Sequence, residues 1–219
     1  MNVMILSAGI GRRLLPLTEN RPKPLMRVGG QTLIERHIER LVESGFTNIV
    51  INLFHLGDAI EAHLGTGERL GAQIRYIREA QLLETGGGIT NALSLLDRDF
   101  LVVNGDIYTD FDFGTLPQSL APGVLGHLVM VDNPCHHPDG DFGIGDADRL
   151  TLDGKLLTYS GISIFSRELF KGCKSTPFPL RKVFDPAVGS GLMTGEHYQG
   201  FWTDVGTVER FEELLSLRS

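Results

Sequence analysis

The chain of 219 residues has few of the features that mark secreted or membrane proteins. It contains only two cysteines, Cys135 and Cys173, and they do not stand in the spacing of a metal site. We expect both to be unpaired thiols in a reducing compartment. No stretch approaches the ~20 apolar residues of a membrane span, and the N-terminus lacks the basic and apolar regions of a signal peptide. These absences predict a cytoplasmic protein.

Basic residues are also scarce, with 20 Lys and Arg against 27 Asp and Glu, which gives a formal net charge of −7. Neutralising nucleic-acid phosphates requires a basic face, so this balance argues against a general nucleic-acid binder. A small anionic substrate is still compatible, because local charge can oppose the net charge. Hydrophobic residues at 42% and charged residues at 21% are typical of a globular domain. We expect one domain over residues 1–219, acting as a monomer or a small homo-oligomer.

The first half of the chain alternates short apolar runs with segments of helical spacing, which predicts an α/β fold with a parallel sheet covered on both faces. Ligands in such folds bind at the carboxyl ends of the strands, so the loops after Leu6 and Val103 are the expected site. The predicted strands are 3–6, 48–53, 72–77 and 100–104, and the predicted helices are 32–44, 57–64 and 88–96.

The second half is less regular. Segment 133–145, rich in Pro, Gly and His, is its most irregular stretch; it is a candidate substrate lid, and a solvated loop is the alternative. The predicted strands here are 125–131, 162–165 and 201–205, and the predicted helices are 168–172, 180–188 and 208–217.

A glycine-rich, basic segment follows the first predicted strand and reads Gly9-Ile10-Gly11-Arg12-Arg13-Leu14. Glycines let backbone N–H groups wrap a phosphate chain, and the arginines add positive charge. In an acidic protein this concentration of basic residues predicts a polyphosphate site, with an ordinary surface loop as the alternative. The segment is not a Walker A sequence, and the leucine at position 14 breaks the G-x-G-x-x-G fingerprint of a dinucleotide-dependent oxidoreductase.

The wider pattern G-x-G-x-R-L-x-P-L-T, followed by Pro22-Lys23-Pro24-Leu25, resembles the signature of sugar-1-phosphate nucleotidylyltransferases. The similarity runs over essentially the whole chain, with Arg12 in place of the family's usual threonine. The resemblance implies the Rossmann-like nucleotidyltransferase fold, with a mixed, mostly parallel central sheet flanked by helices. It assigns nucleotide binding to about residues 1–110 and sugar binding to about residues 111–219.

The resemblance also implies a catalytic set of Arg13, Lys23 and Asp106. A carboxylate at the end of a strand suits a hard divalent cation that also binds phosphate oxygens. By resemblance Asp106 and Asp204, the latter in a W-x-D-x-G-T motif, hold Mg²⁺. The alternatives are that Asp106 caps a turn and that Asp204 caps the last helix, a role that Thr207 can also fill.

The segment Glu84-Thr85-Gly86-Gly87-Gly88 resembles the family's G-T-[AG]-G segment, which lies against the nucleoside, with Glu84 in place of the usual glycine. We place it before a helix and interpret its glycines as backbone that a base and ribose approach closely; a plain loop-to-helix turn is the alternative. The implied nucleotide-binding residues are Ala8, Gly9, Gly11, Arg12, Arg13, Lys23, Glu79, Thr85 and Gly86.

Several features narrow the substrate. The chain lacks the Glu-Lys-Pro triplet that many family members carry for a generic hexose 1-phosphate. Segments 131–142 and 195–198 resemble the members that use UTP and N-acetylmuramate 1-phosphate in peptidoglycan recycling. This implies that Asn104 and Asp141 contact the sugar. The alternatives are glucose or mannose 1-phosphate with another nucleotide, and a non-catalytic nucleotide-sensing domain.

Overall fold

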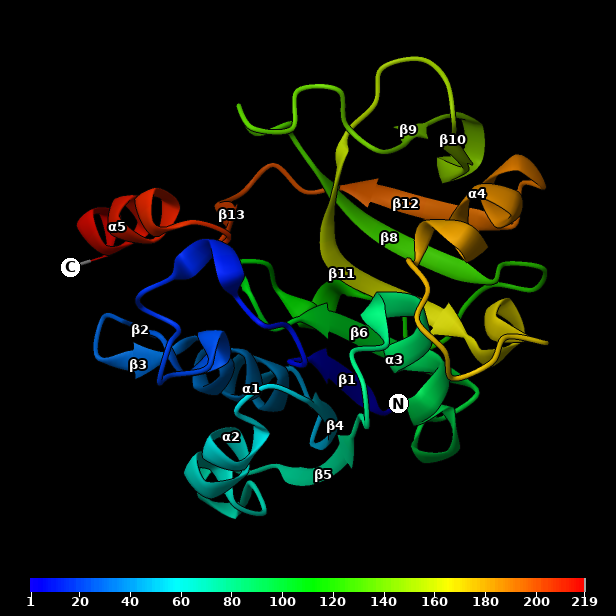
Figure 1. The fold of residues 1–219 in the computed structure, drawn as a ribbon. Coiled ribbons are helices and arrows are strands. Elements are labelled where there is room, and N and C mark those ends of the chain that lie inside the picture. Colours follow the sequence, from blue (N-terminus) through cyan, green and yellow to red (C-terminus); the bar gives the residue numbers. More distant parts are fainter. Residues whose placement is uncertain (219) are drawn as a thin grey trace.

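The computed structural model describes residues 1–218 and is built on one seven-stranded sheet in the order β12-β8-β11-β6-β1-β4-β5 (Figure 1). β11 runs antiparallel to both of its neighbours, β6 and β8, whereas the other neighbouring pairs are parallel. The predicted mixed, mostly parallel sheet is therefore confirmed. The strands are β1 (Val3–Leu6), β4 (Asn48–Leu53), β5 (Gln73–Arg78), β6 (Asp99–Asn104), β8 (Gly126–Val131), β11 (Thr158–Ser166) and β12 (Met193–His197).

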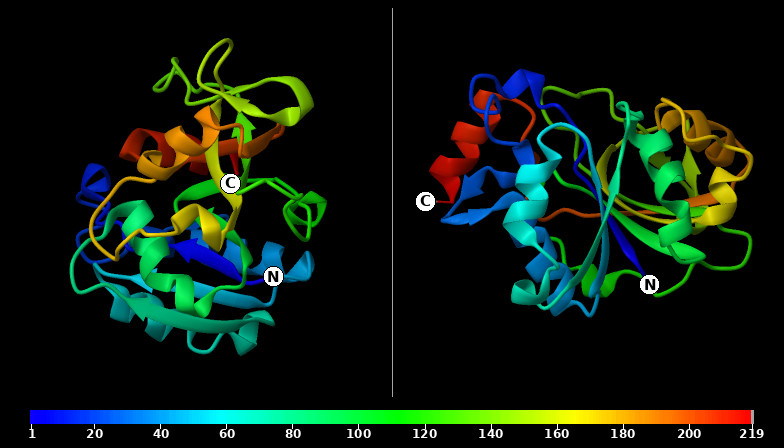
Figure 2. Two further views of the ribbon diagram at one scale, coloured as in Figure 1. Left: turned by 90° about the vertical axis from the view of Figure 1, so that its right-hand side faces the viewer. Right: turned by 60° about the horizontal axis from the view of Figure 1, so that its bottom comes forward.

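Side chains alternate between the two faces of this sheet, because successive residues of a strand point in opposite directions. In β1, Val3 and Ile5 pack into one hydrophobic cluster, and Met4 packs into another. Helices α1 (Leu33–Glu43) and α2 (Gly57–Leu64) contribute to the first cluster, and α3 (Glu84–Ala92) and α4 (Arg181–Gly189) to the second. The sheet therefore lies between two layers of helices (Figure 2).

A third, smaller cluster lies beside the sheet and includes Leu14, Val205 and Phe211. It packs α5 (Val208–Leu217) against the chain that follows β1. The remaining strands form short pairs: β2 (Arg27–Val28) with β3 (Gln31–Thr32), β7 (Ile107–Thr109) with β13 (Trp202–Asp204), and β9 (Gly143–Ile144) with β10 (Leu150–Thr151). The 3-10 helices are Arg12–Leu14, Lys23–Leu25, Glu68–Leu70, Leu93–Leu95, Phe113–Thr115, Asp146–Asp148 and Arg167–Phe170.

The bounds of β1, β4, α2 and α5 agree with the sequence prediction. The strand predicted at 162–165 extends over Thr158–Ser166 in the structure. Its first residues were missed because a register shift between Tyr159 and Ile162 interrupts the alternation of side chains. Gly161 stands in that irregularity with φ +84°, a conformation that favours glycine. The helix predicted at 168–172 is a short 3-10 helix, and β12 was not predicted. None of the helices within residues 1–218 is long and apolar enough to cross a membrane.

Helix α3 begins at Glu84 rather than at the predicted residue 88, so the glycines of this segment lie inside its first turns. A Cβ atom on Gly86 would lie 2.2 Å from the ring of Phe178, and one on Gly87 would lie 2.2 Å from the carbonyl oxygen of Thr176. These glycines are therefore required by close packing within the protein. This corrects the interpretation that they make room for a ligand.

Gly86→Ala should destabilise the fold by about 2–3 kcal/mol, because the added methyl group overpacks a site with no free space. Gly189→Ala is the matched control: it lies at the end of α4, and nothing beyond the helix's own backbone lies within 4 Å of the place its Cβ would take. Alanine is favoured over glycine in a helix, so the control should be neutral or stabilising by up to about 1 kcal/mol. Urea unfolding of both variants measures this difference, and equal effects would contradict the packing argument.

The start of α1 is fixed by a reciprocal capping box. The Oγ1 atom of Thr32 accepts a hydrogen bond from the Glu35 backbone N–H at 3.2 Å, and the Glu35 carboxylate accepts one from the Thr32 N–H at 3.2 Å. Arg69 also donates to this carboxylate at 2.7 Å. Burial raises the pKa of Glu35, but these hydrogen bonds outweigh it and lower the pKa from 4.5 to about 2.

Glu35→Gln should lower the free energy of unfolding by about 3 kcal/mol at neutral pH, since one pKa unit corresponds to about 1.4 kcal/mol. The depressed pKa means that the stabilisation is complete above the unfolded-state value of 4.5 and is lost as the pH falls toward about 2. Urea unfolding between about pH 7 and pH 2.5 should show the two proteins converging. The exposed Glu43→Gln on the same helix is the control, and a pH-independent difference for Glu35→Gln would contradict the electrostatic origin.

Candidate active site

A cleft of about 520 Å³ opens at the carboxyl ends of β1, β4 and β6. It lies where the order of the parallel strands places a ligand site, and it contains both loops that the sequence pointed to. Its walls are formed by the N-terminal loop, the start of α3, the turn after β6 and the residues just before α4 and α5. The lining residues are Leu6, Ser7, Ala8, Gly9, Gly11, Arg12, Arg13, Lys23, Pro24, Asn52, Leu82, Glu84, Thr85, Asn104, Gly105, Asp106, Pro179, Leu180 and Gly206.

The N-terminal loop is held in shape by the residues of its motif. Leu14 is fully buried in the third cluster, which explains an apolar residue at the position that the dinucleotide fingerprint gives to glycine. Gly11 has φ +69°, and its carbonyl oxygen accepts a hydrogen bond from the Thr18 hydroxyl at 2.9 Å. The loop is closed by these contacts, and Arg12 and Arg13 are left exposed along the cleft.

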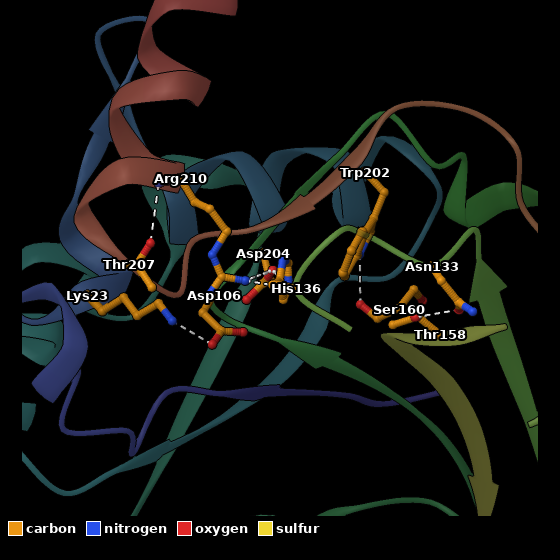
Figure 3. A network of polar contacts seen from close by, with 10 residues as sticks. All are labelled: Lys23, Asp106, Asn133, His136, Thr158, Ser160, Trp202, Asp204, Thr207 and Arg210. Carbon is orange, nitrogen blue, oxygen red and sulfur yellow. Dashed lines mark hydrogen bonds and ion pairs between the residues drawn. The ribbon is translucent and has the colours of Figure 1, made fainter. Parts of the chain in front are cut away.

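An ion pair joins the N-terminal region to the turn after β6. Lys23 Nζ donates to Asp106 Oδ2 at 2.6 Å (Figure 3). The lysine side chain is 11% exposed, whereas that of Asp106 is 41% exposed toward solvent. The predicted catalytic cation and carboxylate are thus in direct contact, and each neutralises the other.

Strand pairing brings the second predicted metal ligand to the same place. In the β7–β13 ladder Asp204 stands opposite Ile107, and the N–H of Val205 donates to the Asp106 carbonyl at 2.7 Å. Thr207 is the N-cap of α5, so the alternative that Asp204 caps this helix is wrong. The two carboxylates are therefore carried by neighbouring backbone positions, although they are far apart in the sequence.

Asp204 is itself paired in this structure. Its Oδ1 atom accepts a hydrogen bond from Arg210 Nη1 and lies 3.1 Å from His136 Nε2 (Figure 3). His136 belongs to segment 133–145, so this stretch contacts the candidate metal ligand. Neither contact was predicted, since no local pattern links residue 204 to residue 136 or to residue 210.

The donor set fits a divalent cation completed by substrate. Mg²⁺ is usually held by one or two carboxylates together with phosphate oxygens and water, and Asp106 and Asp204 supply two carboxylates near the N-terminal loop. Among residues 1–218, no three His, Cys, Asp or Glu side chains gather closely enough to hold a metal ion by themselves. The residues present therefore suit an ion that arrives with a nucleotide.

Two of the predicted nucleotide-binding residues lie behind the wall of the cleft. Gly86 packs against Phe178, while the buried Glu79 carboxylate accepts hydrogen bonds from Asn52 at 2.7 Å and from the Leu83 N–H at 2.9 Å. Asn52 in turn accepts from the Ser7 N–H at 2.8 Å. Asn52 was missed by the sequence reasoning, although a polar residue near the carboxyl end of an apolar strand was the available signal.

The two predicted sugar contacts differ in position. Asn104 lines the cleft at the end of β6. The Asp141 carboxylate accepts a hydrogen bond from the Tyr159 N–H at 2.9 Å and lies 3.4 Å from Arg181 Nη1. Arg181 follows Leu180, which lines the cleft, whereas Asp141 itself is not among the lining residues.

Comparison with known proteins agrees with this geometry. The family model for the nucleotidyl transferase family matches residues 2–154. The chain is 43% identical to N-acetylmuramate alpha-1-phosphate uridylyltransferase of Neisseria meningitidis serogroup B, over 99% of this chain and 98% of the relative. It is 32% identical to the protein of the same name from Caulobacter vibrioides, over 93% and 90%.

The crystal structure of HddC from Yersinia pseudotuberculosis, complexed with GMP-PN, has the same fold, with a TM-score of 0.82 at 23% identity and coverage of 100% and 99%. The match of the family model extends over most of the chain, and the two relatives span nearly all of it. The chain therefore belongs to the nucleotidyl transferase family, within its sugar-1-phosphate branch.

Proposed function

We propose that this chain is a cytoplasmic, Mg²⁺-dependent enzyme that transfers the uridylyl group of UTP to N-acetylmuramic acid α-1-phosphate. The products are UDP-N-acetylmuramic acid and pyrophosphate, and the reaction belongs to peptidoglycan recycling. The observation that carries this proposal is the near-full-length similarity to two proteins named for that activity. The similarity includes the second half of the chain, to which the sugar is assigned.

The N-terminal loop is suited to the triphosphate. Gly9 and Gly11 line the cleft without side chains, so backbone N–H groups can approach phosphate oxygens directly. Arg12 and Arg13 line the same cleft and are exposed. We assign Arg13 to the stabilisation of the departing pyrophosphate, because a guanidinium stays charged and can donate two hydrogen bonds to one phosphate.

The chemical step needs no general base. A phosphate monoester is already anionic at neutral pH, so an oxygen of the sugar phosphate attacks the α-phosphorus of UTP as the bond to pyrophosphate breaks. Catalysis then depends on positioning and on neutralising charge. Lys23 lines the cleft with a largely buried side chain, so its ammonium group can neutralise the crowded anionic centre.

Asp106 and Asp204 would hold the Mg²⁺ ion. When bound, the ion would supply charge neutralisation at the phosphate oxygens. The strand pairing of β7 with β13 supports this assignment, because it fixes the backbone positions of the two carboxylates relative to each other. Asp204 lies within this ladder and Asp106 directly precedes it, so the two backbone positions are held relative to each other.

The remaining assignments follow the walls of the cleft. Ala8 and Thr85 line it from two different segments, the loop after β1 and the start of α3, and are assigned to the nucleoside. Glu79 is assigned to the same subsite as a residue that braces Asn52, and Gly86 as one that allows α3 to pack closely. Asn104 is assigned to direct contact with the sugar.

Asp141 is assigned to the sugar side through its contact with Arg181. The guanidinium of Arg181 lies 4.6 Å from the Phe142 ring centroid, and Arg181 directly follows the cleft residue Leu180. A muramic acid carries a carboxylate that glucose and mannose lack. Arg181 is a cation beside Asp141 that could pair with that carboxylate.

Substrate choice can be measured directly. With UTP, we expect the kcat/KM for N-acetylmuramate 1-phosphate to exceed that for glucose 1-phosphate or mannose 1-phosphate by at least about tenfold, because only the muramate carries a carboxylate that Arg181 can bind. The assay is pyrophosphate release across a matrix of UTP, dTTP and GTP against the three sugar phosphates. Much faster turnover of glucose 1-phosphate would overturn the muramate assignment and leave the family assignment intact.

The metal assignment predicts that Asp106→Ala lowers kcat by at least about 100-fold at saturating Mg²⁺, because it removes a carboxylate that holds the ion. The fold should stay intact, since the Asp106 side chain is 41% exposed. Asp153→Ala is the control, because it removes an exposed carboxylate that does not line the cleft. Circular dichroism checks folding, and near-normal turnover of the Asp106 variant would refute the assignment.

A further inference from the structure

Arg210 is the shared partner of two groups that come from distant parts of the chain. It lies in the first turn of α5, and its side chain is only 14% exposed. Its Nη1 atom donates to Asp204 Oδ1 and lies 2.6 Å from His136 Nε2. The guanidinium therefore stands between the candidate metal ligand and segment 133–145 (Figure 3).

The chemistry of the three groups makes Arg210 the donor in this contact. A guanidinium only donates hydrogen bonds, so the imidazole nitrogen of His136 and the carboxylate of Asp204 both accept from it. The two acceptor atoms are 3.1 Å apart. While Nε2 accepts from the guanidinium, it does not also donate to Asp204. In this structure the contact of His136 with Asp204 is therefore made through Arg210.

The backbone next to Asp204 is adapted to the guanidinium. Gly206 lines the cleft, and a Cβ atom there would lie 2.1 Å from Arg210 Nη2. Glycine at this position lets the guanidinium pass against the wall of the cleft and reach the carboxylate. Arg210 therefore lies against Gly206, a residue of the cleft wall, while it donates to the Asp204 carboxylate.

The pair formed by Lys23 and Asp106 is different. Lys23 contacts a single carboxylate, and both members of the pair line the cleft. Breaking that pair frees one carboxylate. Breaking the Arg210 pair also removes the partner of His136, and so alters a second segment of the chain.

We propose that Arg210 holds Asp204 in the place of a divalent cation, and that an ion binding to Asp204 displaces the guanidinium and releases the segment that carries His136. Mg²⁺ prefers oxygen ligands and has little affinity for imidazole, so His136 does not follow the ion. Arg210 is then a positioning residue that couples metal binding to the freedom of segment 133–145. The inference rests on the proposed role of Asp204 as a metal ligand.

The first test measures the binding of Mn²⁺ alone, and the electron paramagnetic resonance signal of the free ion reports how much remains unbound. Arg210→Met should tighten Mn²⁺ binding about threefold to tenfold, because the ion no longer competes with a paired guanidinium. Arg210→Lys keeps the charge but not the fork of donors, so its affinity should fall between the two.

Arg218→Met is the matched control, since it removes the same kind of Arg–Asp pair at the other end of α5, where Arg218 contacts Asp110. Its affinity for Mn²⁺ should equal that of the wild type. Equal affinity in wild type and Arg210→Met, including no detectable binding in either, overturns the proposal. So does weaker binding in Arg210→Met, which would mean that Arg210 orients Asp204 for the ion.

The second test is hydrogen–deuterium exchange of peptides covering residues 133–141. Mg²⁺ alone should raise exchange in the wild type, and Arg210→Met should show the raised level without metal. Unchanged exchange in Arg210→Met, or protection on adding Mg²⁺ to the wild type, overturns the proposal; protection would mean that His136 joins the ion. Both tests omit UTP and the sugar phosphate, so failure of the substrate assignment does not affect their outcome.

Discussion

The antiparallel pairing of β7 with β13 places Asp204 beside the turn that carries Asp106, and the candidate site depends on this ladder. The ladder is short, with three residue pairs, and it joins a strand that follows β6 to one that precedes the last helix. The hydrogen bond from the Val205 N–H to the Asp106 carbonyl oxygen fixes the spacing of the backbone positions that carry the two carboxylates. Packing of Leu14 and Phe211 in the third cluster holds the N-terminal loop and α5 together beside that ladder. The N-terminal loop and the two carboxylates are therefore held by the same part of the fold.

Charge in the cleft is arranged in opposed pairs. The chain as a whole is acidic, yet the wall formed by Arg12 and Arg13 is basic. Each candidate metal ligand is neutralised by a side chain from another segment, Lys23 for Asp106 and Arg210 for Asp204. A polyphosphate that entered the cleft with a cation would meet candidate ligands that are already screened, so repulsion between carboxylates and phosphates would be reduced. The same pairs keep either carboxylate from standing uncompensated before substrate binds.

Glycine serves two distinct purposes around the cleft. Gly11 adopts a positive φ that the loop needs, and Gly9 leaves its backbone open to a ligand. The glycines of α3 instead let a helix lie against residues 176–178 and against the buried Glu79. From sequence these two uses look alike, because both place glycines in a connection that follows a strand. Only the neighbours of each missing Cβ distinguish them.

Local patterns in the sequence are sufficient to predict the central strands, most of the helices between them and the reaction class. Apolar runs such as that of β4 specify buried strands through local hydrophobicity, and the motif from Gly9 to Thr18 carries its own loop contacts. Elements that break these local rules were missed: β11 is irregular at Gly161, and β12 contains glycine and charged residues because it lies at the edge of the sheet. The contact of Arg210 and His136 at Asp204, in contrast, arises only in the folded chain. Residues 136 and 210 are 74 positions apart, and a contact over that distance is set by strand pairing and core packing rather than by any local pattern.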